Sequence, residues 1–207
     1  MDKELETRLE KVLEITPKKG KLLEIGSYPF IITEELIKRG YDVSGLDLNH
    51  TRVKIGVQHC NIEKEAFPFK DKTFDIVLMM EVIEHLGINP INAIQESKRV
   101  LKDNGIFVLT TPNILRLQNL KSIIIKKKQL ATLRSLTQKE KIGYIGHIRE
   151  YTKNELKEIL KYCGFKSFQT CMFEGSSYFP TKFIVSFFPS YSTTIMIAAK
   201  KGEKWDG

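Results

Sequence analysis

The feature that most limits what this chain can fold into is a regular alternation of two patterns. Short apolar runs, such as residues 21–26 and 41–48, have the length and composition of buried strands. Around them lie segments such as 2–15, in which apolar residues recur at the spacing of an amphipathic helix. Strands that alternate with helices form parallel βαβ units, so the order predicts an α/β fold with a largely parallel sheet.

The same patterns predict the other elements. Thr152 and Glu155 form a capping box at a helix start, and Asp103-Asn104-Gly105 marks a turn before a strand. Residues 113–150 interrupt the alternation and are predicted to be a helical insertion within a single domain, 1–207. Helices are predicted over 2–15, 31–39, 91–101 and 152–162, a helical turn over 81–86, and strands over 21–26, 41–48, 55–59, 74–80, 106–112, 165–173 and 192–200.

A glycine and two acids mark the ends of the first two predicted strands. In an open parallel sheet, ligands bind beyond the carboxyl ends of the strands. Gly26 ends the first strand and lets the backbone approach a ligand closely, while Glu24 can organise the turn. Asp47 ends the second strand, where a carboxylate can accept both hydroxyls of a ribose. The separation of Gly26 and Asp47 along the sequence is typical of nucleotide-binding domains.

Two further strand ends complete the predicted site. Asn61 and Ile62 follow the third strand, and an amide beside an apolar side chain can recognise and pack an adenine. The fourth strand ends near Met80 and Glu81. These four strand ends together predict a site for a ligand that contains a nucleoside.

At this point the sequence resembles the class I S-adenosylmethionine (SAM) dependent methyltransferases. The matching pieces cover nearly the whole chain in family order: LLEIG, GLDLN, FPFKDKTFDIVLMMEVIEHL, RVLKDNGIFVLTTPN and GHIREYTKNELKEILKYCGF. The resemblance implies a Rossmann-like, three-layer α/β/α fold with a mostly parallel seven-stranded sheet, whose last strand, 192–200, is antiparallel. It also implies that SAM contacts all four strand ends, through Glu24, Gly26, Ser27, Tyr28, Asp47, Leu48, Asn61, Ile62, Met80 and Glu81.

The glycine loop departs from the family pattern. That loop is usually an acid followed by three alternating glycines, whereas this chain reads EIGSYPF, with Tyr28 and Phe30 in place of the later glycines. The first glycine, Gly26, is kept. The substitutions leave open a second interpretation, in which the chain is a non-catalytic binding protein with a degenerate SAM fold.

A second motif carries candidate catalytic and metal-binding residues. Glu81, Glu84 and His85 share one face of a helical turn, and His147 follows the insertion. This ExxEH pattern with a distant histidine resembles metal-dependent O-methyltransferases that act on the 2′-hydroxyls of RNA ends or in the ubiquinone pathway. The resemblance implies a divalent ion (Mg²⁺, Mn²⁺ or Zn²⁺) on Glu81, Glu84, His85 and His147, which would activate a hydroxyl.

The same motif has an interpretation without metal, because EVIEHL also occurs in class I methyltransferases with no known ion. Glu81 and Glu84 would then line the pocket, and His85 or His147 would be the general base. Arg149 or Tyr151 would orient the acceptor.

The acceptor side is defined less closely by the sequence. The TTPN strand end and the basic insertion are similar to methyltransferases of surface-polysaccharide synthesis, which implies a hydroxyl on a small, glycosidic or lipid-linked acceptor. The insertion, with Lys126–Lys128, is expected to be a lid, and its alternative is a helix on an anionic membrane. The net charge of +8 admits RNA as an acceptor, but no aromatic stacking platform favours it.

The cysteine content and the N-terminal residues both indicate where in the cell the protein is expected. The chain has three cysteines and no CxxC motif, which argues against a disulfide framework. Its first fifteen residues are charged and contain no apolar leader. We therefore expect a cytoplasmic enzyme.

Overall fold

The computed structural model describes residues 3–48, 56–87, 89–127, 146–174 and 179–201. Within these ranges, seven strands form one sheet in the order β3-β2-β1-β4-β5-β7-β6. The first five strands run parallel, and β7 runs antiparallel to both of its neighbours. The strands are β1 (Lys21–Ile25), β2 (Asp42–Asp47), β3 (Val57–His59), β4 (Phe74–Met80), β5 (Leu101–Pro112), β6 (Ser167–Phe173) and β7 (Thr194–Lys200). The predicted fold class and the antiparallel last strand are confirmed.

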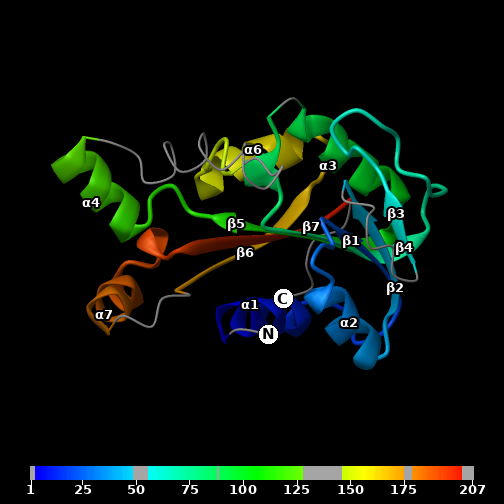
Figure 1. The fold of residues 1–207 in the computed structure, drawn as a ribbon, viewed down its shortest axis with the longest axis horizontal. Helices are drawn as coiled ribbons and strands as arrows, with labels where there is room; N and C mark the ends of the chain where they lie inside the picture. Colours follow the sequence, from blue (N-terminus) through cyan, green and yellow to red (C-terminus); the bar gives the residue numbers. More distant parts are fainter. Residues whose placement is uncertain (1–2, 49–55, 88, 128–145, 175–178, 202–207) are drawn as a thin grey trace.

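Helices cover both faces of the sheet, which gives the three layers (Figure 1). On one face, α1 (Lys3–Glu14) and α2 (Ile31–Lys38) bury side chains such as Leu9 and Leu36 against the sheet. On the other, α3 (Pro90–Val100) and α6 (Lys153–Tyr162) bury Ile94 and Leu156. Burying one such side chain stabilises the fold by about 1.5–3 kcal/mol, so these apolar faces hold the helices in place.

The local structure follows the sequence patterns at the start of α6 and after β4, and differs from them at the start of β5. The Thr152 hydroxyl accepts the Glu155 N–H and the Glu155 carboxylate accepts the Thr152 N–H, so α6 begins with the predicted capping box. The predicted helical turn after β4 is a short 3-10 helix, η1 (Ile83–His85). The turn predicted at 103–105 does not separate two elements. It is a register irregularity inside β5, which starts at Leu101 and not at Ile106.

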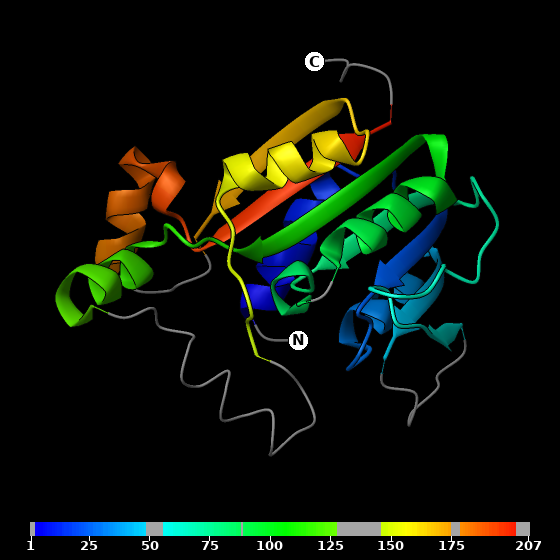
Figure 2. The same ribbon diagram turned by 90° about the horizontal axis from the view of Figure 1, so that it is seen from above.

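Two helices lie at one end of the molecule, beyond the sheet (Figures 1 and 2). One is α4 (Leu117–Lys126), in the predicted insertion. The other is α7 (Phe179–Phe187), followed by the 3-10 turn η2 (Pro189–Tyr191), between the last two predicted strands, where the sequence patterns predict no helix. Among the described residues, no helix is long and apolar enough to cross a membrane.

Some predictions fall on residues that the structure does not describe. They include the first residue of the predicted N-terminal helix, Asp2, and the start of the third predicted strand, Ile55. Most of the predicted insertion, 128–145, also lies outside the described residues, with Lys128 among them. The lid therefore stays a prediction.

Candidate active site

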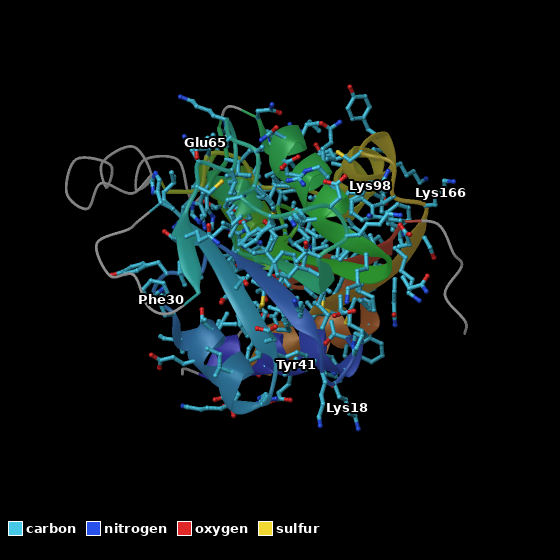
Figure 3. All side chains as sticks on the ribbon, turned by 90° about the vertical axis from the view of Figure 1, so that its right-hand side faces the viewer. Lys18, Phe30, Tyr41, Glu65, Lys98 and Lys166 are labelled. Atoms are coloured by element: carbon cyan, nitrogen blue, oxygen red, sulfur yellow. The ribbon has the colours of Figure 1, made fainter. Side chains whose placement is uncertain are left out.

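The carboxyl ends of the parallel strands bring the first set of predicted residues together. The Gly26 N–H donates to the carbonyl oxygen of Leu46 over 2.8 Å, and the Tyr28 N–H donates to Asp47 Oδ2 over 2.9 Å. The loop after β1 is therefore tied to the end of β2. Figure 3 shows Phe30 on this side of the molecule and Lys98 on the opposite side, where β5 begins.

Gly26 occupies a position that no other residue fits easily. Its φ is 74°, in the left-handed region that residues with a Cβ avoid. A Cβ added there would lie 2.5 Å from Cγ2 of Val82. The glycine thus provides both the turn and the close approach between β1 and the segment after β4.

Glu24 is a buried carboxyl group two residues before this turn. It is 4% exposed, and the Thr33 hydroxyl of α2 donates a hydrogen bond to it. Burial raises the pKa of Glu24 to about 8, against the lowering effect of the Thr33 hydrogen bond, and the nearby Asp47 charge raises it further. The free protein therefore holds Glu24 largely protonated at neutral pH.

Tyr28 and Phe30, the two departures from the glycine pattern, have different environments. Phe30 is buried and begins α2 with a φ of 70°, a conformation that glycine adopts without strain. Tyr28 is 49% exposed, and its ring lies edge-on to that of Phe30, 5.8 Å between centroids. Between β1 and Tyr28, the buried Ser27 hydroxyl has no hydrogen-bond partner among the described residues.

The predicted adenine-binding segment lies beside Asp47. The Cys60 N–H donates to the Asp47 carbonyl oxygen, which places the loop after β3 against the end of β2. Asn61 Oδ1 accepts the Glu63 N–H over 3.2 Å, so this side chain shapes its own loop. Ile62 is buried, whereas Leu48 is 58% exposed.

The end of β4 brings Glu81 close to two groups that the sequence did not indicate. The Thr110 hydroxyl of β5 donates to Glu81 Oε1 over 3.0 Å. Arg8 of α1 lies near the other oxygen, with 3.8 Å between Nη1 and Oε2. Met80, just before, is buried in the core. The N-terminal helix thus contributes a cation to this edge.

Glu84, His85 and His147 form a compact cluster, with one ligand atom of each within 4.8 Å of the others. Glu84 Oε2 accepts the Thr111 hydroxyl over 2.9 Å, and Glu84 Oε1 is fully buried and has no hydrogen-bond partner within the described part of the chain. Nε2 of His85 and Nε2 of His147 lie 3.9 and 4.0 Å from that oxygen. Burial, followed by the Glu81 charge, raises the pKa of Glu84 to about 8.

His147 is held in orientation by a second carboxylate. Its Nδ1 lies 3.1 Å from Glu150 Oε1, and Arg116 pairs with both oxygens of Glu150. Burial alone would raise the pKa of Glu150, but the hydrogen bonds from His147 and Arg116 outweigh it and lower that pKa. An ionised Glu150 accepts from Nδ1–H, which leaves the lone pair on Nε2, toward Glu84.

Backbone hydrogen bonds fix the segment that carries His147. The Ile148 N–H donates to the Glu84 carbonyl oxygen over 2.7 Å, and the Ile114 N–H donates to that of Tyr151 over 3.1 Å. The segment after the insertion therefore returns to the ends of β4 and β5. The predicted meeting of His147 with Glu84 and His85 is present, while Glu81 lies outside the cluster.

Sequence reasoning missed the supporting residues Arg8, Arg116, Glu150, Thr110 and Thr111. Glu150 carries a weak signal, since it follows His147 by three residues in GHIRE. The two residues considered for the acceptor are placed otherwise: the Tyr151 ring is buried, and Arg149 pairs with Glu155.

Two cavities lie away from these residues. One, of about 370 Å³, is lined by residues including Lys72, Lys98 and Lys201, at the opposite edge of the sheet. The other, of about 320 Å³, lies between Phe173 and Val185.

Comparison with known proteins gives three findings on sequence. Residues 1–170 match the family described as a methyltransferase domain. The chain is 32% identical over 103 residues to the ubiquinone biosynthesis O-methyltransferase of Pelagibacter ubique, an alignment that covers 45% of this chain and 42% of that relative. It is 30% identical over 186 residues to an uncharacterized protein of Methanocaldococcus jannaschii, covering 82% and 72%. The chain thus spans less than half the length of the ubiquinone-pathway relative.

The fold also has solved counterparts. A SAM-dependent methyltransferase from Thermotoga maritima superposes with a TM-score of 0.68, covering 96% of this chain and 89% of its own. The two sequences are 18% identical, so the likeness concerns the fold.

Proposed function

This chain belongs to the class I SAM-dependent methyltransferases, and from that premise we propose that it transfers the methyl group of SAM to a hydroxyl oxygen of a small, glycosidic or lipid-linked acceptor. Membership of this family implies that SAM is the methyl donor. The choice of oxygen rests on the cluster of Glu84, His85 and His147 at the same edge of the sheet as Gly26 and Asp47.

In this proposal each strand end binds a different part of the cofactor. Asp47, fixed by the Tyr28 N–H, accepts the ribose hydroxyls. Glu24 and Gly26 face the amino-acid part, with Ser27 and Tyr28 beside them. Asn61 and Ile62 enclose the adenine, with Leu48 beside them, and Met80 and Glu81 border the reacting end.

The observation that carries the choice of oxygen is the orientation of His147. A hydroxyl must lose its proton as it attacks, so a nearby base is useful, while SAM already has a good leaving group and gains mainly from alignment. The oxygen forms a bond to the methyl carbon as the carbon–sulfur bond breaks, which leaves S-adenosylhomocysteine. The proton passes to Nε2 of His147, and the resulting imidazolium is stabilised by the ionised carboxylate of Glu150, 3.1 Å from Nδ1.

The same cluster supports a second form of the proposal, with a divalent ion. One carboxylate and two imidazoles suit Mn²⁺ or Zn²⁺, and Glu84 Oε1 is a buried oxygen to which no described residue donates a hydrogen bond. A bound ion would lower the pKa of an acceptor hydroxyl. Glu84, His85 and His147 would hold it, and Glu150 would fix the ring of His147 as carboxylates do behind metal-bound histidines. Glu81 would lie outside this set.

The cofactor assignment is tested by calorimetry with SAM and S-adenosylhomocysteine. We expect Asp47→Ala to weaken binding at least tenfold, because the ribose loses its acceptor. Asp42→Ala is the matched control, since Asp42 begins the same strand at its opposite end. Equal affinity of the two variants would contradict the ribose assignment, and no heat with either ligand would favour the non-catalytic interpretation.

The acceptor class is tested with radiolabelled SAM and separate pools of glycosides, lipid-linked sugars and RNA. We expect transfer to a hydroxyl of the first two pools. We also expect His147→Ala to lower kcat by at least a hundredfold with a smaller effect on the KM for SAM, and added imidazole to restore part of the rate. Transfer to RNA alone, or to a nitrogen, would overturn the proposed acceptor.

The ion is tested by metal analysis of the purified protein and by titration with Mn²⁺ and Zn²⁺. We expect Glu84→Gln to abolish binding, while Glu158→Gln, on the exposed side of α6, leaves it unchanged. If neither metal binds the wild-type protein, only the form with His147 as the base is left.

A further inference from the structure

Hydrogen bonds connect the segment that precedes α4 to the segment that follows α7, the two helices at the end of the molecule. The Asn113 side chain, at the end of β5, donates to the carbonyl oxygens of Ser190 and Ser192, each over 2.9 Å. The segment that leads into α4 and the segment that follows α7 therefore leave the sheet from one place. Figures 1 and 2 both show the two helices projecting at this end.

The second half of α4 turns its apolar residues outward. Asn119 and Ser122 are buried, and the Asn119 amide donates to the Ile114 carbonyl oxygen. Ile124 and Ile125 are 74% and 67% exposed. A helix on a water-soluble surface normally buries its apolar residues, so this half of α4 departs from the usual arrangement.

α7 and the turn after it repeat this exposure with aromatic rings. Phe183, Phe187 and Phe188 are 60%, 68% and 59% exposed, while Val185 packs inward. The Phe183 and Phe187 rings lie 5.3 Å apart between centroids. Grouped apolar side chains at one end of a molecule mark an interaction surface.

The sequence that carries these helices is basic. No Asp or Glu occurs in the sequence between Asp103 and Glu140, or between Glu174 and Glu203. The first of these stretches carries lysines on and just after α4, including Lys121, Lys126 and Lys127. Exposed isoleucine and phenylalanine on such basic segments complement a surface that is apolar inside and anionic outside.

We propose that this end of the molecule, defined by Ile123, Ile124, Ile125, Phe183, Phe187 and Phe188 and called here the α4–α7 surface, docks on an anionic lipid bilayer. The inference goes beyond the proposed function, since docking requires neither SAM nor a particular acceptor. It also gives the docked protein an orientation. The α4–α7 surface continues from the carboxyl end of β5, the edge that carries Glu84 and His147, so the site lies near the lipid headgroups.

The test is flotation of the full chain with vesicles of phosphatidylcholine, with or without one third phosphatidylglycerol. We expect binding to the anionic vesicles only, and weaker binding as salt rises from 50 to 500 mM. Replacing Lys126 and Lys127 by Gln should weaken binding about fivefold for each lysine. Lys18 and Lys19, which are exposed just before the start of β1, are the matched control for charge.

The apolar contribution is tested with Ile124→Asn and Ile125→Asn in one variant and Phe187→Ser and Phe188→Ser in another. Each should reduce vesicle binding at least tenfold and leave the affinity for S-adenosylhomocysteine unchanged. Tyr162→Ser, which removes a 76% exposed ring from α6, should change neither. Failure of the wild-type protein to float would overturn the proposal. So would a dimer that the Ile124 and Ile125 changes dissociate, because the α4–α7 surface would then be a contact between copies.

Discussion

Glu24 is a carboxyl group that burial keeps protonated at neutral pH in the free protein. SAM carries an ammonium and a sulfonium, so a carboxylate beside it must be ionised to attract it. Binding should then release a proton, and affinity should increase with pH, by up to about tenfold per unit below a pKa of about 8. Calorimetry between pH 6 and 9 measures this. Glu24→Gln should flatten the profile, while Glu158→Gln should not; a flat wild-type profile would contradict the assignment.

The same carboxyl predicts a change in stability. Its folded pKa is raised, so its contribution to stability is fully present below the unfolded value near 4.5 and is lost as pH rises through about 8. Without cofactor, the melting temperature of the wild-type protein should therefore fall between pH 6 and pH 9 by more than that of Glu24→Gln. An equal fall in both proteins would indicate that Glu24 is ionised already at pH 6.

Gly26 and Gly40 form a matched pair for measuring how much the close approach of Gly26 to Val82 contributes to stability. Both have positive φ, 74° and 89°, but a Cβ would meet Val82 only at Gly26. Gly40→Ala should cost about 1–2 kcal/mol of unfolding free energy from backbone strain alone. Gly26→Ala should cost about 1–3 kcal/mol more, because an inserted methyl forces its neighbours apart. Chemical denaturation measures both, and equal losses would mean that Val82 moves aside freely.

At the scale of elements, an ion pair joins the start of α4 to the segment that carries His147. Arg116 precedes the first turn of α4 and holds Glu150, which in turn holds His147. Glu150→Gln should lower kcat by about tenfold to a hundredfold, by analogy with the outer-shell partners of ligating histidines, and leave the KM for SAM nearly unchanged. Glu158→Gln, which removes an exposed carboxylate from α6, is the control for charge.

The elements that the sequence predicted best are those with a single strong pattern. The strands β1 and β4 are apolar runs bounded by turns, and α6 has its capping box. The start of β5 was misjudged because Asp103-Asn104-Gly105 has turn chemistry, which the sheet accommodates as an irregularity beside β4. α7 was missed because prolines and a nearly continuous apolar composition conceal helical periodicity. Its exposed phenylalanines contradict the usual rule that apolar residues are buried.

Within the candidate site, residues at strand ends could be predicted, whereas their partners could not. Gly26 directly follows β1, Asp47 ends β2 and Glu84 lies in the short turn after β4, and topology places such positions at one edge. Arg116 and Glu150 meet only because the chain returns after the insertion, and no local pattern encodes that return.

At the scale of the whole molecule, ligand binding should appear as global stabilisation. A ligand that binds only the folded state at one hundred times its Kd stabilises it by about 2.7 kcal/mol. For a chain of this length, that corresponds to a rise of roughly 5–10 °C in melting temperature. Thermal unfolding with S-adenosylhomocysteine measures the rise, which Asp47→Ala should remove. A ligand that leaves the melting temperature of the wild-type protein unchanged would argue against the site as a whole.

The position of β7 has a consequence for the order in which the molecule is made. β6 pairs with β7 and with no other described strand, and β7 is the strand that joins it to β5. On the ribosome, residues 167–173 therefore emerge before the neighbour that they need, and the apolar run 194–199 emerges after it. We expect nascent chains arrested before residue 194 to be cut by protease within 167–173, and release of the completed chain to protect that segment.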